Sequence, residues 1–394
     1  MMKVLVSDNL EDVGLDLLRR EPEIQVDVRA GLKPEELKAI IGEYDALIIR
    51  SATKVTEDLM KAAHRLKVVG RAGIGLDNVD IPAATKRGII VMNTPAGNVV
   101  TTAEHAIAMM FSIARQIPEA NASTHAGKWE KNRFMGVELT GKTLGVIGCG
   151  NIGSIVADRA IGLKMRVIAF DPFLSHERAI DIGVEKVELD ELLRRADFIT
   201  LHTPLTDKTR NIIDATAIAK MKSGVRIVNC ARGGLIEEAA LLAGLKSGKI
   251  AGAALDVFET EPPTDSPLLT LDNIIVTPHL GASTVEAQTN VAVSVAKQCL
   301  EVLKGGSAKY VVNAPMVPPD QAEVLQPYAQ LAEKMGRFAI QIAPGRLASV
   351  ECIYGGDLSA YAASMKFVTR LALKGLLDPI LQQPVNIVNA EFIA

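Results

Sequence analysis

The sequence predicts an α/β protein with two doubly wound parallel sheets, followed by a short α+β segment toward residue 394. Two observations lead to this prediction. Short runs rich in valine and isoleucine alternate with helical segments over residues 4–93, and the same alternation starts again near residue 143. Strands that alternate with helices pair in parallel through right-handed crossovers, so each series is expected to form one layered domain.

Length and composition fit a globular protein of two or three domains. The 394 residues are 48% hydrophobic and 23% charged, which excludes a disordered chain, and the net charge of −3 predicts no nucleic-acid partner. The first residues hold an apolar run too short for a signal peptide, and no apolar stretch reaches membrane-spanning length, so we expect a cytoplasmic protein with no membrane partner. The 4 cysteines lack a metal-binding spacing, which predicts reduced thiols and no metal site.

In the first series each expected strand is a short apolar run, and each expected helix repeats apolar residues at helical spacing. The strands are expected at 4–7, 24–28, 46–49, 68–70 and 88–93, and the helices at 11–20, 34–41, 56–63 and 81–88. This succession favours a flavodoxin-like sheet. A long helical stretch follows at 98–123, in which Pro118 is expected to end or kink the helix.

The second series is typical of a Rossmann-type domain. Its strands are expected at 143–148, 166–171, 197–203, 226–231, 251–258 and 273–278, and its helices at 151–165, 190–196, 214–221 and 237–246. Beyond it we expect a helix at 284–304, a proline-rich linker at 315–319, a helix at 320–342, a strand at 347–353 and a helix at 360–376.

A glycine-rich turn between the first strand and the first helix of this series indicates a dinucleotide site. Gly148 permits a tight turn, Gly150 lets a pyrophosphate approach the backbone, and Gly153 allows the helix to contact the strand. Asp171 ends the next strand 23 residues after Gly148, near the offset of about 20 expected of a ribose-binding acid. Its carboxylate would accept both ribose hydroxyls and repel a 2′-phosphate, which favours NAD over NADP. A glycine turn that serves only packing is the alternative.

Three further side chains follow strands of the second series, where open α/β sheets bind their ligands. Arg232 precedes two glycines, Glu261 precedes two prolines, and His279 follows the last strand. Each alone could be an ordinary surface arginine, loop glutamate or hydrogen-bonded histidine. Together they fit hydride transfer from a 2-hydroxy acid, because a cation can clamp the substrate carboxylate while a carboxylate-oriented histidine takes the hydroxyl proton.

Six motifs make the chain resemble the D-isomer-specific 2-hydroxyacid dehydrogenases over nearly its whole length. They are GRAGIGLDNVD, NTPAGN, GCGNIG, NCARGGLIEE, AALDVFETEPP and TPHLGAST. The resemblance implies that Arg232, Glu261 and His279 form the catalytic set. It also implies NAD contacts, besides the three glycines and Asp171, at Asn151, Ile152, Thr203, Cys230, Asp256 and Gly281.

The same resemblance implies a discontinuous domain organisation. Residues 1–98, completed by 284–314, would bind substrate, residues 99–283 would bind NAD, and residues 315–394 would begin an intervening domain. Long members of the family continue into a regulatory serine-binding domain, whereas this chain stops within a strand-like run at 385–392. We therefore expect a C-terminally truncated form that serine does not regulate.

Substrate recognition is expected at two arginines that follow strands of the first series, Arg50 and Arg71. A phosphate needs cations that do not also serve the substrate carboxylate. The resemblance implies substrate contacts at these arginines and at Gly75 and Asn98, whereas ordinary surface or inter-domain ion pairs are the alternative.

The reaction implied by the resemblance is NAD-dependent oxidation of 3-phospho-D-glycerate to 3-phosphohydroxypyruvate, the first step of L-serine biosynthesis, by a homo-oligomer (dimer or tetramer). Two alternatives stay open. One is a reductase of glyoxylate, hydroxypyruvate or another short 2-keto acid, and the other is an NAD-sensing corepressor that mainly binds proteins. His105, on the long helix, is expected to be a hydrogen-bonded core or interface histidine.

Overall fold

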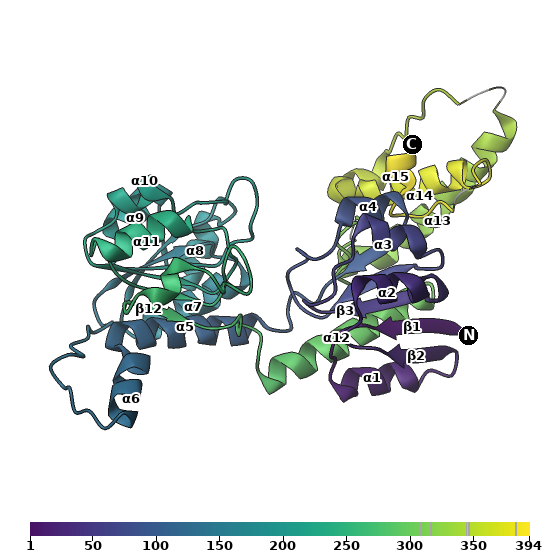
Figure 1. Ribbon diagram of the computed structural model, residues 1–394. Helices are drawn as coiled ribbons and strands as arrows, with labels where there is room; N and C mark the ends of the chain where they lie inside the picture. Colours follow the sequence, from purple (N-terminus) through teal and green to yellow (C-terminus); the bar gives the residue numbers. More distant parts are fainter. Residues whose placement is uncertain (307–308, 316, 344, 346, 383) are drawn as a thin grey trace. The chain divides into compact units, whose positions relative to one another are not determined.

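The computed structural model describes residues 1–306, 309–315, 317–343, 345, 347–382 and 384–394. The chain forms two compact units, each built around one parallel sheet (Figure 1). Unit 1 contains Met1–Gly97 and Val285–Ala394, and unit 2 contains Asn98–Thr284. The region after residue 315 thus groups with unit 1. Within the described ranges, no helix combines the length and the apolar character needed to cross a bilayer.

Unit 1 has a five-stranded parallel sheet in the order β2-β1-β3-β4-β5, which is the flavodoxin-like order. Its strands are β1 (Met2–Val6), β2 (Ile24–Val28), β3 (Ala46–Ile49), β4 (Val68–Arg71) and β5 (Ile90–Met92). Its first helices are α1 (Asp12–Arg19), α2 (Pro34–Ile40), α3 (Glu57–Ala62) and α4 (Ile81–Lys86), with a 3-10 turn η1 (Ile41–Glu43). All four residues of β3 are buried, because helices cover both faces of the sheet.

One face of this sheet is covered by a helix that comes from much later in the chain. α12 (Val285–Leu303) packs beside α1 and against β4, as its green ribbon shows beside the purple strands in Figure 1. Val291, Val295 and Cys299 of α12 share one core cluster with Val4 and Val6 of β1. The N-terminal sheet therefore depends on residues near 295 for its core.

Unit 2 has a seven-stranded parallel sheet in the order β12-β11-β10-β9-β6-β7-β8. Its strands are β6 (Thr143–Ile147), β7 (Arg166–Phe170), β8 (Glu185–Lys186), β9 (Phe198–Leu201), β10 (Val225–Asn229), β11 (Ile250–Leu255) and β12 (Ile274–Val276). The winding reverses between β6 and β9, which pair directly, and such a reversal is where doubly wound sheets bind ligands.

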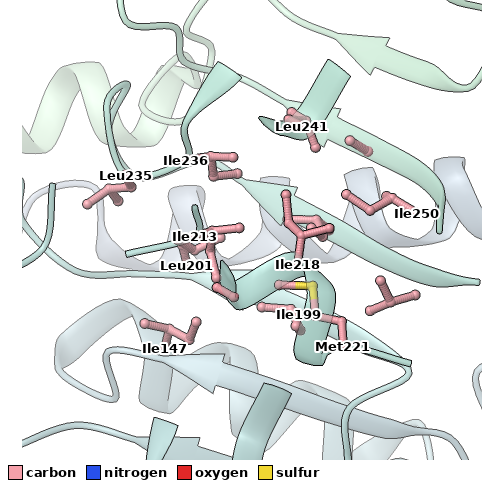
Figure 2. Close-up of a cluster of buried hydrophobic side chains, with 14 of the residues drawn as sticks. Ile147, Ile199, Leu201, Ile213, Ile218, Met221, Leu235, Ile236, Leu241 and Ile250 are labelled. Carbon is pink, nitrogen blue, oxygen red and sulfur yellow. The ribbon is translucent and has the colours of Figure 1, made fainter. Parts of the chain in front are cut away.

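Helices cover both faces of the second sheet and bury an aliphatic core. They are α5 (Val99–Arg115), α6 (Ile117–His125), α7 (Asn151–Gly162), α8 (His176–Ile182), α9 (Leu189–Arg195), α10 (Ala215–Lys220) and α11 (Glu238–Lys246), with a 3-10 turn η2 (Pro267–Thr270). Figure 2 shows part of one core cluster, in which Ile199 and Leu201 of β9 lie near Ile218 of α10. The predicted break at Pro118 occurs two residues earlier, because Gln116 takes a left-handed φ of 53° and Pro118 lies in the first turn of α6.

The C-terminal region is helical, so the predicted α+β character of this segment is wrong. It contains α13 (Pro319–Ile342), the 3-10 segment η3 (Gly356–Ser364), α14 (Met365–Leu377) and α15 (Ala390–Ile393). The strand expected at 347–353 does not form, since these residues find no described strand with which to pair. Part of the expected linker, residue 316, lies outside the described residues.

The strand-like run at 385–392 is also not a strand. It forms a turn and then α15, because the asparagine side chains bond the local backbone. The Asn386 side chain accepts a hydrogen bond from Val388 N–H at 2.9 Å, and the Asn389 side chain accepts one from Asn386 N–H at 2.7 Å. Asparagine forms such turns readily, and this competes with strand pairing.

Candidate active site

The glycine-rich turn of unit 2 joins β6 to α7 and has the shape of a phosphate-binding loop. A Cβ on Gly153 would lie 2.0 Å from the carbonyl oxygen of Gly148, so only glycine permits this contact between helix and strand. A Cβ on Gly150 would meet nothing within 4 Å, which leaves room for a ligand at the start of α7. Asn151 and Ile152 form the first turn of this 12-residue helix, whose free N–H groups attract an anion.

Asp171 follows β7 and places its carboxylate against the same turn. Oδ2 accepts a hydrogen bond from Cys149 N–H and Oδ1 accepts one from Phe173 N–H, both at 2.8 Å. The side chain remains partly exposed, and each oxygen keeps lone-pair capacity for a hydroxyl donor. These residues fit the pyrophosphate and the adenosine ribose of a dinucleotide.

The other predicted NAD contacts lie at the carboxyl ends of neighbouring strands. Thr203 follows β9, Cys230 follows β10 directly and Asp256 follows β11 directly, while Gly281 lies in the loop after β12. Burial, with a smaller effect of the Asp256 charge, raises the pKa of the Cys230 thiol, which is therefore an inert thiol rather than a nucleophile.

His279 and Glu261 form a hydrogen-bonded pair. The distance from His279 Nδ1 to Glu261 Oε2 is 2.8 Å, and Glu261 Oε1 accepts a hydrogen bond from Phe258 N–H at 3.1 Å. Burial raises the pKa of Glu261, but the hydrogen bonds from His279 and Phe258 outweigh this, so the pKa of this carboxyl lies below its ordinary value. An ionised Glu261 fixes the proton of His279 on Nδ1 and leaves Nε2 as the proton acceptor.

Arg232 belongs to a loop in backbone contact with the loop of Glu261. A Cβ on Gly233 would lie 1.8 Å from the carbonyl oxygen of Phe258, so the two loops approach closely only because residue 233 is glycine. The buried side chain of Asn229 donates a hydrogen bond to the carbonyl of Arg232 at 2.8 Å and holds this loop at the end of β10. The loops of the three predicted catalytic residues are therefore in contact: the Arg232 loop approaches the Glu261 loop, and Glu261 bonds to His279.

The predicted substrate residues are distributed over both units. In unit 1, Arg50 follows β3 and Arg71 ends β4, and the two strands are paired so that Ile49 lies opposite Arg71. A Cβ on Gly73 would lie 2.0 Å from Arg71 Nη1, so glycine leaves space for this guanidinium.

Gly75 lies in the same loop after β4. Asn98 instead precedes α5 in unit 2, where its side chain is buried.

Sequence reasoning missed the residues that hold the Arg50 loop. The buried carboxylate of Asp8 accepts hydrogen bonds from Arg50 N–H at 2.6 Å and from the Thr53 hydroxyl at 2.7 Å. Asn78 donates from its side chain to the carbonyl of Arg50 at 2.7 Å. The signal in the sequence was the position of Asp8, which directly follows the strand expected at 4–7 just as Arg50 follows the strand at 46–49.

His105 is hydrogen-bonded, as predicted, but sequence reasoning missed Thr102 and the row of polar residues that it forms with His105 and Asn98 along α5. Thr102 donates a hydrogen bond to the carbonyl of Gly281 at 2.8 Å, and His105 Nε2 lies 3.3 Å from Asp256 Oδ1. Asn98, Thr102 and His105 are spaced four and three residues apart, which places them on one face of a helix. That spacing was the signal in the sequence.

Comparisons with known proteins show which families this chain is similar to. Residues 107–281 match the profile of the "D-isomer specific 2-hydroxyacid dehydrogenase, NAD binding domain", and residues 324–394 match that of the "D-3-phosphoglycerate dehydrogenase intervening domain". The D-3-phosphoglycerate dehydrogenase of Synechocystis sp. is 51% identical over 394 residues, which cover 100% of this chain and 71% of that protein. The D-3-phosphoglycerate dehydrogenase of Methanocaldococcus jannaschii is 50% identical over 395 residues, covering 100% of this chain and 75% of that protein.

Solved structures show the same fold. The TT0316 protein of Thermus thermophilus superposes with a TM-score of 0.74 at 34% identity, covering 79% of this chain and 100% of that one. The D-lactate dehydrogenase of Aquifex aeolicus, solved with NAD and lactic acid, superposes with a TM-score of 0.70 at 28% identity, covering 77% of this chain and 96% of that one.

Proposed function

Because the chain belongs to the D-isomer-specific 2-hydroxyacid dehydrogenases, among the D-3-phosphoglycerate dehydrogenases, we propose that it performs their reaction with the residues described above. It is an NAD-dependent oxidoreductase that converts 3-phospho-D-glycerate to 3-phosphohydroxypyruvate in L-serine biosynthesis. The hydrogen bond between His279 and Glu261 is the observation on which the assignment of catalytic roles depends.

In this proposal three side chains of unit 2 have separate roles in the reaction. Arg232 binds the substrate carboxylate, and His279 accepts the proton of the C2 hydroxyl on Nε2 while Glu261 keeps the ring oriented through Nδ1. NAD, when bound, supplies the acceptor for the hydride that leaves C2 with its electron pair. The glycines of the turn, the first residues of α7 and Asp171 would hold that cofactor, with further contacts at Thr203, Cys230, Asp256 and Gly281.

Arg50 and Arg71 bind the substrate phosphate in this proposal, and Gly75 and Asn98 provide further substrate contacts. What supports it is the position of both arginines at the carboxyl ends of adjacent strands, with space kept for Arg71 by Gly73. In this proposal residues 1–98 together with 284–314 bind the substrate, and residues 99–283 bind NAD. Residues 315–394 begin the intervening domain.

Initial-rate kinetics on 2-hydroxy acids with and without a phosphate test this proposal. Arg50→Ala should lower kcat/KM for 3-phosphoglycerate by one to two powers of ten, since a hydrogen bond to a charged group contributes about 1.5–3 kcal/mol. It should barely change turnover of D-lactate or D-glycerate. An equal loss on both substrate types would instead favour a general reductase of short 2-keto acids.

We also propose that the protein is a homo-oligomer, a dimer or tetramer. The segment after α6 supports this, because Trp129 is 81% exposed and Met135 is 76% exposed. An interface with a second copy would remove these two large apolar side chains from water.

A further inference from the structure

We propose that His105 is a positioning residue for the reaction, which holds the loop of His279 through the buried carboxylate of Asp256. The inference rests on the proposed role of His279 as proton acceptor. All of the residues involved lie in unit 2, and they come from α5, from the end of β11 and from the loop after β12.

Asp256 clamps the His279 loop on both sides of the histidine. Its side chain is 0% exposed, and its Oδ1 accepts hydrogen bonds from the Thr277 hydroxyl at 2.6 Å and from Leu280 N–H at 2.7 Å. Its Oδ2 accepts one from Gly281 N–H at 2.8 Å. The Asp256 carboxylate therefore bonds to Thr277 before His279 and to Leu280 and Gly281 after it.

The clamp matters because the backbone of His279 is strained. Its φ of 56° lies in the left-handed region, which a residue other than glycine occupies only when its surroundings hold it there. This conformation carries the ring that contacts Glu261. If the bonds to Asp256 weakened, the loop could relax and the His279 ring would leave its place beside Glu261.

His105 completes the clamp from the helix side. Its Nε2 lies 3.3 Å from both Asp256 Oδ1 and Thr277 Oγ1, and its side chain is 19% exposed. Burial raises the pKa of Asp256, but the hydrogen bonds from His105, Thr277 and Leu280 outweigh this and hold that pKa below its ordinary value. An ionised carboxylate accepts stronger hydrogen bonds than a neutral carboxyl, so a donor at position 105 favours the form of Asp256 on which the bonds to the loop depend.

Three variants test the inference against the unmodified enzyme. His105→Leu removes the donor and keeps an apolar side chain of similar bulk, whereas the His105→Gln amide can still donate to Asp256. His64→Leu is the matched control, because His64 is exposed and belongs to unit 1. The measurements are kcat and KM for 3-phosphoglycerate, and the unfolding temperature.

We expect His105→Leu to lower kcat roughly ten- to hundredfold, since a misplacement of about 1 Å in a catalytic group can cost about 10²-fold. KM for 3-phosphoglycerate and the unfolding temperature should change much less. His105→Gln should recover most of kcat, and His64→Leu should match the unmodified enzyme. A purely structural role of His105 would instead lower the unfolding temperature in step with activity and would not distinguish Gln from Leu.

Unchanged kcat in His105→Leu, or equal losses in the Leu and Gln variants, would overturn the inference. If His105→Leu does not fold, Thr277→Val removes another donor to the same carboxylate and should lower kcat in the same way; full activity there would also overturn it. His279→Ala distinguishes failure of the proposed proton acceptor from failure of the positioning role of His105. If that variant keeps full activity the proposed proton acceptor is wrong, whereas loss there with full activity in His105→Leu and Thr277→Val removes only the positioning role.

Discussion

At the scale of single residues, chemical type and position after a strand were enough to find the catalytic candidates. Arg232, Glu261 and His279 each follow a strand of one parallel sheet, so their loops had to meet at its carboxyl edge. Their supporting partners could not be found in this way. Asp8 bonds Thr53 and Arg50 across more than 40 residues of chain, and such pairs depend on the folded geometry.

The role of His279 predicts a selective loss of catalysis. His279→Ala should lower kcat by about 10²–10⁴-fold, because the C2 hydroxyl loses its proton acceptor. Glu261→Gln should cost less, since Nε2 remains and only the orientation and charge at Nδ1 change. Steady-state kinetics measures the loss of kcat, and NADH fluorescence measures cofactor binding, which should change little. A near-normal kcat for His279→Ala at every pH would contradict the role of His279 as proton acceptor.

Asp171 predicts the choice of cofactor. Asp171→Ser should raise KM for NAD by one to two powers of ten, because hydrogen bonds to a charged group contribute about 1.5–3 kcal/mol. It should also narrow the preference for NAD over NADP, since the charge that repels a 2′-phosphate is gone. The measurement is kcat/KM with NAD and with NADP, for the unmodified enzyme and for Asp171→Ser. If the unmodified enzyme used NAD and NADP equally well, the role of Asp171 would be refuted.

At the scale of elements, periodicity located the buried strands and helices well and failed where an element is short or lacks a neighbour. β3 was predicted with its observed bounds because all four of its residues are apolar and buried. β8 was missed because it has two residues, both exposed and charged. The expected strand at 347–353 has apolar residues but no described strand beside it, and a strand needs a partner more than a helix does.

The exposed segment after α6 predicts an effect on assembly. Trp129→Ser combined with Met135→Ser should shift the protein toward smaller species, because the change removes two large apolar side chains from a proposed interface. Light scattering after size-exclusion chromatography measures this. Ile180→Ser, which alters an equally apolar exposed side chain on α8, is the control and should leave the mass unchanged. The same mass for all three proteins would argue against this interface.

At the scale of the whole molecule, the two units have separate cores, and the match to the NAD binding domain lies in unit 2. NADH should therefore stabilise the unfolding transition of unit 2 by about 2.7 kcal/mol at a hundredfold excess over its Kd, and leave that of unit 1 nearly unchanged. The single tryptophan of the sequence, Trp129, lies in unit 2, so its fluorescence follows this unit while circular dichroism follows both. One transition that shifts as a whole would contradict independent units.

The return of α12 to the first sheet has a consequence during protein synthesis. Val4 and Val6 leave the ribosome early, whereas Val291 and Val295, which cover them, follow only after unit 2 has been made. These residues are about 290 positions apart, so at about 5–20 residues per second the delay is roughly 15–60 s. During that time unit 2 can fold by itself, but one apolar face of the N-terminal sheet stays open to water and to other nascent chains. The first sheet is thus completed only after unit 2 has been made, and its open face is where a chaperone would act.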